Sequence, residues 1–296
     1  MAFLDSTSKE WADILKGRES LIRKIKEFDN FNIDPVSLPS LFIQVLFEID
    51  ANQREILSTA TGFVVKHNGI YYLITNLHVV TGRHTETGKC LHGLGAVPNK
   101  LRIWHHSTLA TMGYGAWGFR EESLYDGEEK PLWLEHPNKN IKDRDNYLEP
   151  NVDVIALPLT DLDKNVLIHP IEIDELDFDI KLSPGTTCHI VGYPFGRSAK
   201  SFPIWKTGHI ASDIAVHKNQ RHFFIDATTR EGMSGSPVVY RTFGPYESNS
   251  GEIIMNSSIK TRFLGIYSGR IEKDIEVGMV WTPNIIKEII NAPKNR

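Results

Sequence analysis

The chain has 296 residues, of which 41% are hydrophobic and 24% are charged, and these ordinary values exclude the disordered and fibrous classes. Its formal net charge of −4 gives no electrostatic reason to expect nucleic acid or an anionic membrane as a partner. Only two cysteines occur, Cys90 and Cys188, which is too few for a disulfide scaffold, so we expect two free thiols.

The first 40 residues are predicted to form a helical extension. Apolar residues recur at helical spacing over 5–28, with charged residues between them. Such a helix either docks on the body of the protein or binds a second copy or a regulatory partner. The sequence begins without a basic start and apolar stretch, and no window approaches the roughly 20 apolar residues of a membrane helix. We therefore expect a soluble, cytoplasmic protein with no membrane partner.

Short runs rich in Val, Ile, Phe and Tyr dominate the chain from about residue 40. Two of them flank Asn68-Gly69, a dipeptide typical of a β-hairpin turn. Because few helical patterns lie between these runs, they predict antiparallel barrels or a sandwich. The polar segment 105–150 is expected to be a long loop or insertion. Near the end, Pro283 followed by 284–290 predicts a short C-terminal helix.

Three segments carry residues that could act together chemically. His78 follows an apolar run, and Asp153 opens another run so apolar that a carboxylate there needs hydrogen-bonding partners. Ser234 has Gly232 and Gly235 on either side, and glycines let a chain turn sharply and direct consecutive N–H groups into one small space. Each segment alone has an ordinary structural explanation, but the three together, each at a strand end, predict nucleophilic catalysis.

The three segments resemble the motifs of the trypsin-like (chymotrypsin-fold) serine peptidases, in particular a bacterial high-temperature-requirement-like branch without a recognisable peptide-binding domain. The matching strings are T-N-L-H at 75–78, D-V-I-A-L at 153–157 and G-M-S-G-S-P at 232–237. The resemblance covers roughly residues 40–291. It implies an all-β fold with two antiparallel six-stranded β-barrels and the active site in the crevice between them, to which the chain adds the N-terminal and C-terminal helices.

The expected organisation therefore has three parts. Residues 1–40 form the helical extension, 41–165 form the first barrel with the insertion 105–150, and 166–296 form the second barrel plus the C-terminal helix. The resemblance implies a serine endopeptidase that hydrolyses peptide bonds through a Ser-His-Asp triad and an acyl-enzyme intermediate. No cofactor or metal is expected, because the adjacent residues His105 and His106 would point to opposite faces of a strand.

The resemblance also assigns roles to individual residues. Ser234 would be the nucleophile, His78 the general base and Asp153 the carboxylate that orients it, while the N–H groups of Gly232 and Ser234 would bind the oxyanion. Met233 stands where secreted relatives carry the Asp that pairs with a newly freed N-terminus. Because methionine cannot form that ion pair, we expect no such activation and an oxyanion loop ordered by packing or by a partner.

Two rival carboxylates, Asp143 and Asp145, lie in a polar stretch and are expected to be solvated, so Asp153 is preferred.

The primary pocket, which would take the side chain before the scissile bond, is placed by the same resemblance. Thr228 would lie near its base, and Ser268, Gly269 and Met279 on its walls, next to the segment 265–268 that resembles the substrate-pairing strand. With no acidic residue at the base, we expect a small or medium apolar side chain before the scissile bond.

A preference for acidic substrates is left open by Arg230 and Arg270. Two histidines of the second barrel, His209 and His222, could help to bind a carboxylate or could be ordinary strand residues.

Two alternatives to a free-standing enzyme are weighed. The chain could be a peptide-binding module that keeps the protease fold, although such a module has no need of all three triad groups. It could also be a protease subunit that is active only in a larger assembly, recruited through the N-terminal helix or through 105–150. In every case the expected partner is a protein or peptide.

Overall fold

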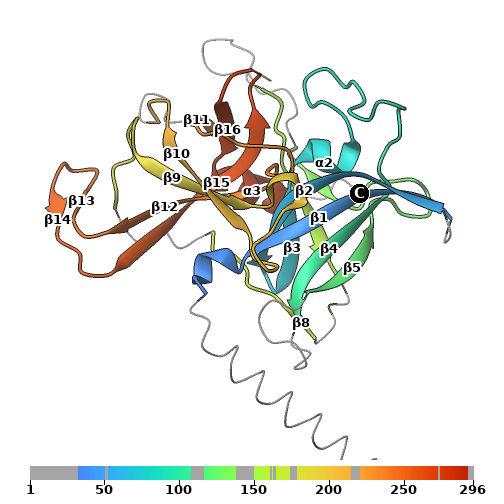
Figure 1. The fold of residues 1–296 in the computed structure, drawn as a ribbon, viewed down its shortest axis with the longest axis horizontal. Coiled ribbons are helices and arrows are strands. Elements are labelled where there is room, and N and C mark those ends of the chain that lie inside the picture. The colour runs from blue at the N-terminus through green and yellow to red at the C-terminus, as the bar shows by residue number, and fades with distance from the viewer. Residues whose placement is uncertain are drawn as a thin grey trace, which may run out of the picture.

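The computed structural model describes residues 33–50, 53–107, 117–137, 150–160, 162, 165–173, 179–214, 221–272 and 274–292. The helix predicted over 5–28 and the rival carboxylates Asp143 and Asp145 lie outside the described residues. The described part of the chain consists mostly of strands, which form two large antiparallel sheets side by side (Figure 1).

The first sheet has eight strands and is built around the long hairpin of β1 and β2. Its pairing order is β5-β4-β1-β2-β3-β7-β6, with β8 paired to β4. The bounds are β1 Ser40–Asp50, β2 Gln53–His67, β3 Ile70–Thr75, β4 Lys100–Ser107, β5 Trp117–Ser123, β6 Leu134–Glu135, β7 Ile155–Leu159 and β8 Val166–Leu167. Between β2 and β3, Asn68 and Gly69 have φ angles of 49° and 80°, which confirms the predicted hairpin turn.

Two of these eight strands come from the segment 105–150, which we expected to be a loop or insertion. β5 pairs with β4, and β6 pairs with β7. β5 lies at the edge of the sheet and its side chains are exposed or half-buried, so it lacks the apolar alternation that would have revealed it in the sequence. Among the described strands, the first and last strands of this sheet, β5 and β6, are not paired with each other. The expected number of six strands per barrel therefore applies to the second sheet alone.

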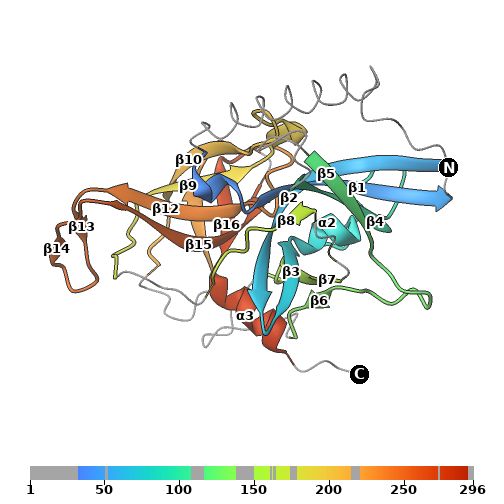
Figure 2. The same ribbon diagram turned by 90° about the horizontal axis from the view of Figure 1, so that it is seen from below.

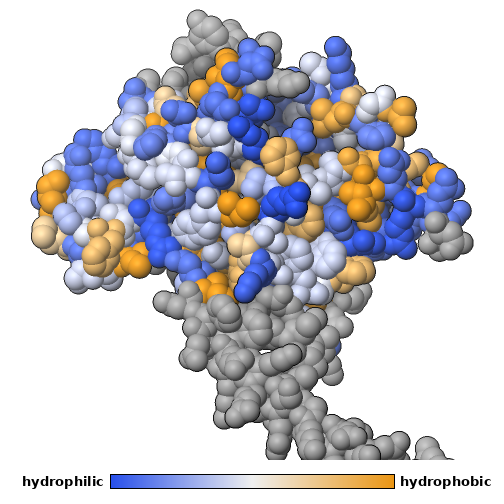
Figure 3. All heavy atoms as spheres, in the orientation of Figure 1, coloured by the Kyte–Doolittle hydropathy of each residue, from blue (hydrophilic) through white to orange (hydrophobic). Residues whose placement is uncertain are grey.

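The second sheet is a closed barrel of six strands, as expected. Its order is β10-β11-β16-β15-β12-β9. The bounds are β9 Thr187–Gly192, β10 Ile204–Ile210, β11 His222–Asp226, β12 Pro237–Phe243, β15 Ile259–Arg270 and β16 Val277–Trp281. A small two-stranded sheet, β13 Tyr246–Glu247 and β14 Ile253–Ile254, extends from the far end of β12 and β15. Figure 3 shows apolar residues at this end of the molecule, where Phe243 and Ile253 are exposed.

The helices are short. They are η1 Pro35–Ser37, α2 Leu77–Thr81, η2 Pro194–Gly196 and α3 Pro283–Asn291. α3 confirms the predicted C-terminal helix, including proline in its first turn. It lies where the two sheets meet and buries Ile285, Ile286 and Ile289 (Figure 2).

Three apolar clusters hold the molecule together. One lies within the first sheet and one inside the closed barrel. The third joins Phe63 and Ile74 of the first sheet to Ile266 and Trp281 of the barrel, with Ile285 of α3 packed against them. Because these side chains are almost completely buried, the third cluster fixes the two sheets relative to each other, so residues on facing loops can form one site.

Both cysteines are free, as expected. Cys188 is buried in the barrel, and this burial raises the pKa of its thiol to about 12. Within the ranges given above, no helix has the length and apolar character needed to cross a membrane. The same ranges contain no cluster of three or more His, Cys, Asp or Glu side chains that could hold a metal ion.

Candidate active site

His78 and Asp153 come together where β3 ends and β7 begins. His78 lies in α2, which follows β3 directly, and Asp153 lies two residues before β7, the strand that pairs with β3. The imidazole Nδ1 is 2.6 Å from Asp153 Oδ2, and the backbone N–H of His78 donates to Oδ1 over 2.9 Å. Asn76 adds a hydrogen bond from Nδ2 to the backbone carbonyl of Asp153, 2.7 Å long. The imidazole and the carboxylate are thus fixed relative to each other by both side chain and backbone.

Asp153 is only 6% exposed, and its carboxylate has further hydrogen-bond donors. Thr85 Oγ1 donates to Oδ1 over 2.9 Å, and Ser268 Oγ donates to Oδ2. Burial alone favours the neutral acid, but the charge of His78 and the hydrogen bonds from His78 and Ser268 outweigh it and lower the pKa of Asp153. Burial also opposes a charge on His78, yet the nearby Asp153 carboxylate raises the pKa of the imidazole above its ordinary value.

Ser234 lies in a tight turn before β12 that requires glycine on both sides. Gly232 and Gly235 have φ angles of 89° and 86°, in the region that other residues rarely adopt. A Cβ atom on Gly235 would lie 1.9 Å from the carbonyl oxygen of Thr61, and one on Gly232 would lie 2.3 Å from that of Tyr193. Both conformation and space therefore exclude a side chain at these two positions.

Thr61 of β2 anchors this turn to the first sheet. Its N–H donates to the carbonyl of Ser234 over 2.9 Å, and its Oγ1 donates to the carbonyl of Gly232 over 2.7 Å. The same Oγ1 accepts a hydrogen bond from the N–H of Tyr193 at 3.1 Å. Sequence reasoning missed this residue, because its role depends on a contact between the two sheets.

The peptide bond between Glu231 and Gly232 has a defined orientation. The N–H of Phe195 donates to the carbonyl of Glu231 over 2.6 Å. In a trans peptide the following N–H points the opposite way, so the N–H of Gly232 is directed away from Phe195. Met233 is completely buried in the barrel core, so packing orders this loop, one of the two routes we expected.

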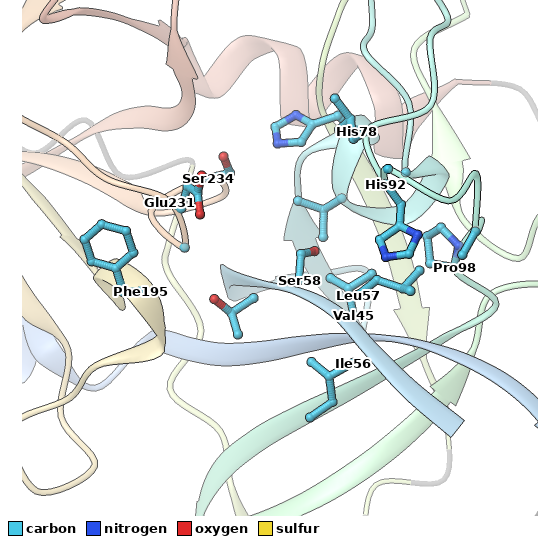
Figure 4. A pocket seen from close by; sticks show the side chains of 17 residues that line it. Val45, Ile56, Leu57, Ser58, His78, His92, Pro98, Phe195, Glu231 and Ser234 are labelled. Atoms are coloured by element: carbon cyan, nitrogen blue, oxygen red, sulfur yellow. The ribbon is translucent and has the colours of Figure 1, made fainter. Parts of the chain in front are cut away.

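Two cavities meet at His78 and Ser234, which line both of them. The larger has a volume of about 680 Å³ and runs between β2 and the loop that carries Phe195 (Figure 4). The smaller, of about 390 Å³, contains Asp153, Ser268, Gly269 and Met279 among its lining residues. Of the residues expected in the primary pocket, these last three therefore lie beside the triad residues, and Ser268 also contacts Asp153.

The structure places Thr228, the residue expected near the base of the primary pocket, outside both cavities. Its side chain is exposed and lines neither of the two cavities, whereas Thr229 is buried and hydrogen-bonded to the hydroxyl of Tyr267. A Cβ on Gly278 would lie 2.4 Å from the Tyr267 ring, which shows that the ring fills the space between Thr229 and β16.

Of the two arginines proposed to favour acidic substrates, Arg270 lines the smaller cavity and Arg230 lines neither. Arg230 and Arg270 both face the carboxylate of Glu276, at 3.4 and 3.8 Å. His209 is exposed, and His222 is buried against the ring of Trp281. Neither histidine lines either cavity, and Glu276 offsets the charge of both arginines.

Comparison with known proteins gives one family and several structures. A family model described as trypsin-like peptidase domain matches residues 60–243. No curated protein matches the chain. The active form of the Rv3671c protease from M. tuberculosis is 17% identical over 90% of this chain and 87% of that one, with a TM-score of 0.41. A serine-to-alanine mutant of the HtrA-type protease AlgW, solved with a tripeptide, is 14% identical over 86% of this chain and 59% of that one, with a TM-score of 0.42.

Proposed function

The chain belongs to the family of trypsin-like peptidases, and we propose that this serine protease cleaves its protein or peptide substrates with Ser234 as nucleophile, His78 as general base and Asp153 as orienting carboxylate. One observation carries the proposal above all others. The buried Asp153 carboxylate holds Nδ1 of His78 at 2.6 Å, next to a glycine-flanked serine that lines the same two cavities.

In the first step, the Ser234 Oγ attacks the carbonyl carbon of the scissile bond and its proton passes to Nε2 of His78. Asp153 keeps the proton of the neutral imidazole on Nδ1, which leaves the Nε2 lone pair free to accept. The new C–O bond moves the carbonyl π electrons onto oxygen. The imidazolium that results is stabilised by the adjacent carboxylate, consistent with the raised pKa of His78.

The negative oxygen of this tetrahedral intermediate would be bound by the N–H groups of Gly232 and Ser234. One such donor is typically worth about 2.7–4 kcal/mol of transition-state stabilisation. When the C–N bond breaks, His78 gives its proton to the leaving amine, and the acyl group stays on Ser234. A water molecule, deprotonated by His78, then attacks the ester and releases the acid and the free serine.

The proposal is tested by comparing wild type with Ser234→Ala on a proteome-derived peptide library. We expect the wild type to cleave the library and Ser234→Ala to lose cleavage while keeping its thermal unfolding temperature, because a lost hydroxyl leaves the backbone bonds of the loop intact. Ser258→Ala, at an exposed serine outside both cavities, is the matched control. Cleavage at the same sites by Ser234→Ala would overturn the assignment.

The same comparison separates an enzyme from a peptide-binding module with a protease fold. A binding module would retain peptides without cutting them, in wild type and in Ser234→Ala alike.

A further inference from the structure

The larger of the two cavities has mostly apolar walls. Leu57 of β2 and Pro98 of the loop after α2 lie on one side, and Phe195 lies on the other (Figure 4). Leu91, from the same loop as Pro98, also lines the cavity. Charged side chains are few among the lining residues, and Glu231 carries the acidic one. His78 and Ser234 line one end of the cavity. A peptide that reacts at Ser234 can therefore extend into the cavity.

A β-bulge in β2 places one of the apolar side chains of this wall. In the β1–β2 ladder, Val45 pairs with Ser58 and Leu46 pairs with Ile56, so Leu57 has no partner residue on β1. A bulge of this kind re-aims side chains and is often found beside active sites. Here the unpaired Leu57 lines the cavity, and a second register shift of the same ladder lies nearer its turn, between Glu48 and Asp50.

Apolar side chains of this wall are held in contact with solvent. Ile56 is 50% exposed and Leu91 is 54% exposed, although both line the cavity. The backbone of Leu91 is tied down by a hydrogen bond from its N–H to the carbonyl of Gly82, 2.8 Å long. Single exposed apolar residues are common, but a continuous group beside a reactive serine indicates a binding surface.

The position of the smaller cavity tells which part of a substrate the larger one would hold. The residues expected beside the side chain before the scissile bond, Ser268, Gly269 and Met279, all line the smaller cavity. An extended peptide with its reacting carbonyl at Ser234 must continue away from that cavity on the other side of His78. The larger cavity is where it would go.

We propose that this apolar cavity binds the substrate residues that follow the scissile bond, and that the enzyme selects a large apolar side chain at one of the first two of them. This inference rests on the proposed function. A volume of about 680 Å³ is in the usual range for a binding pocket and accommodates two or more residues of peptide. Glu231 at its edge disfavours an acidic side chain there.

The first test measures preference in the wild type with internally quenched peptides that differ only after the scissile bond. We expect kcat/KM to be about 10-fold higher with Leu than with Ser at the preferred position, the discrimination typical of one partly buried apolar side chain. Equal kcat/KM values at both positions would overturn the inference.

The second test changes the wall. Leu57→Arg should create a preference for Glu over Leu after the scissile bond, because Leu57 lines the larger cavity and not the smaller one. A misfolded protein could not gain such a preference. Leu94→Arg is the matched control, since Leu94 is 91% exposed and lines neither cavity. If both variants change preference equally, or neither does, the cavity does not select substrates.

Labelling of Ser234 by a small fluorophosphonate distinguishes this failure from failure of the proposed function. A wild type that is labelled at Ser234 but shows no preference after the scissile bond would contradict the inference and leave the proposed function standing. A wild type that cleaves peptides without reacting at Ser234 would contradict both.

Discussion

The carboxylate–imidazole pair and the serine turn are held in place in different ways. Asp153 is a buried charge, and it receives hydrogen bonds from the backbone and ring of His78 and from the hydroxyls of Thr85 and Ser268. The turn around Ser234 is fixed instead by backbone bonds to Thr61 and by glycine conformations. The buried Asp153 carboxylate needs several hydrogen-bond donors to compensate for its lost hydration. The neutral Ser234 hydroxyl needs only a backbone and neighbouring groups in the correct orientation.

This difference predicts that the two parts fail differently when they are altered. Changes at the carboxylate should act through the protonation of His78 and leave the chain folded. Changes at the glycines of the serine turn should act through the backbone and alter stability and activity together.

The largest effect is expected from Asp153→Asn. The amide keeps the shape of the side chain but offers its NH₂ to the imidazole, which favours the wrong tautomer of His78. We expect kcat to fall by about 10⁴-fold. Steady-state kinetics at saturating peptide would measure this, with circular dichroism as the control for folding. A loss smaller than about 10-fold would show that Asp153 is not the orienting group.

A smaller loss of activity, with a larger loss of stability, is expected from Gly235→Ala. The new Cβ atom would collide with the carbonyl oxygen of Thr61, and the alanine backbone would also have to adopt a φ of 86°. We expect the free energy of unfolding to fall by about 3 kcal/mol and kcat/KM by about 10²-fold, because the turn must move.

Gly251→Ala isolates the conformational part of that effect. Gly251 has a φ of 84°, but a Cβ atom added there would meet nothing within 4 Å, so denaturant unfolding should show a loss of only about 1 kcal/mol and no loss of activity. Equal losses in the two variants would mean that close contact with Thr61 is unimportant.

The smallest effect is expected from Thr85→Val, which removes one donor from Asp153. The Asp153 carboxylate raises the pKa of His78 above its ordinary value of 6.5, and catalysis needs the neutral imidazole. We therefore expect kcat/KM to be maximal at high pH and to decrease as the pH falls through the pKa of His78. Without the hydrogen bond from Thr85, the Asp153 carboxylate stabilises the protonated imidazole more strongly, so the pKa of His78 should rise. The midpoint of the pH profile should move to higher pH, and kcat/KM at pH 6.5 should fall a few-fold. Thr85→Ser should restore the wild-type profile, and a uniform loss at every pH would contradict this role.

Much of the fold could be predicted because its signals are local. The turn at Asn68-Gly69 and the helix α3 are specified by residues that are neighbours in sequence. The edge strand β5 could not be, since its polar side chains carry no alternation and its pairing with β4 depends on tertiary contact.

The contacts of the site also divide into those that could and those that could not be predicted from the sequence. The contact between His78 and Asp153 was expected from motifs, but Thr61, Thr85 and the contact of Ser268 with the carboxylate were not. These side chains meet their partners across loops or between sheets, and nothing near them in the sequence marks that contact. Thr228 is exposed, whereas its neighbour Thr229 is buried against Tyr267, and the motif alone did not indicate which of the two side chains points inward.

The central claim is that Ser234 is the nucleophile activated by His78. Treating the wild type with a fluorophosphonate and mapping the adduct by mass spectrometry tests it most directly. We predict a single adduct on Ser234, formed rapidly in wild type, much more slowly in Asp153→Asn and not at all in Ser234→Ala. An adduct on another residue, or labelling of Ser234 at equal rates with and without the Asp153 carboxylate, would contradict it.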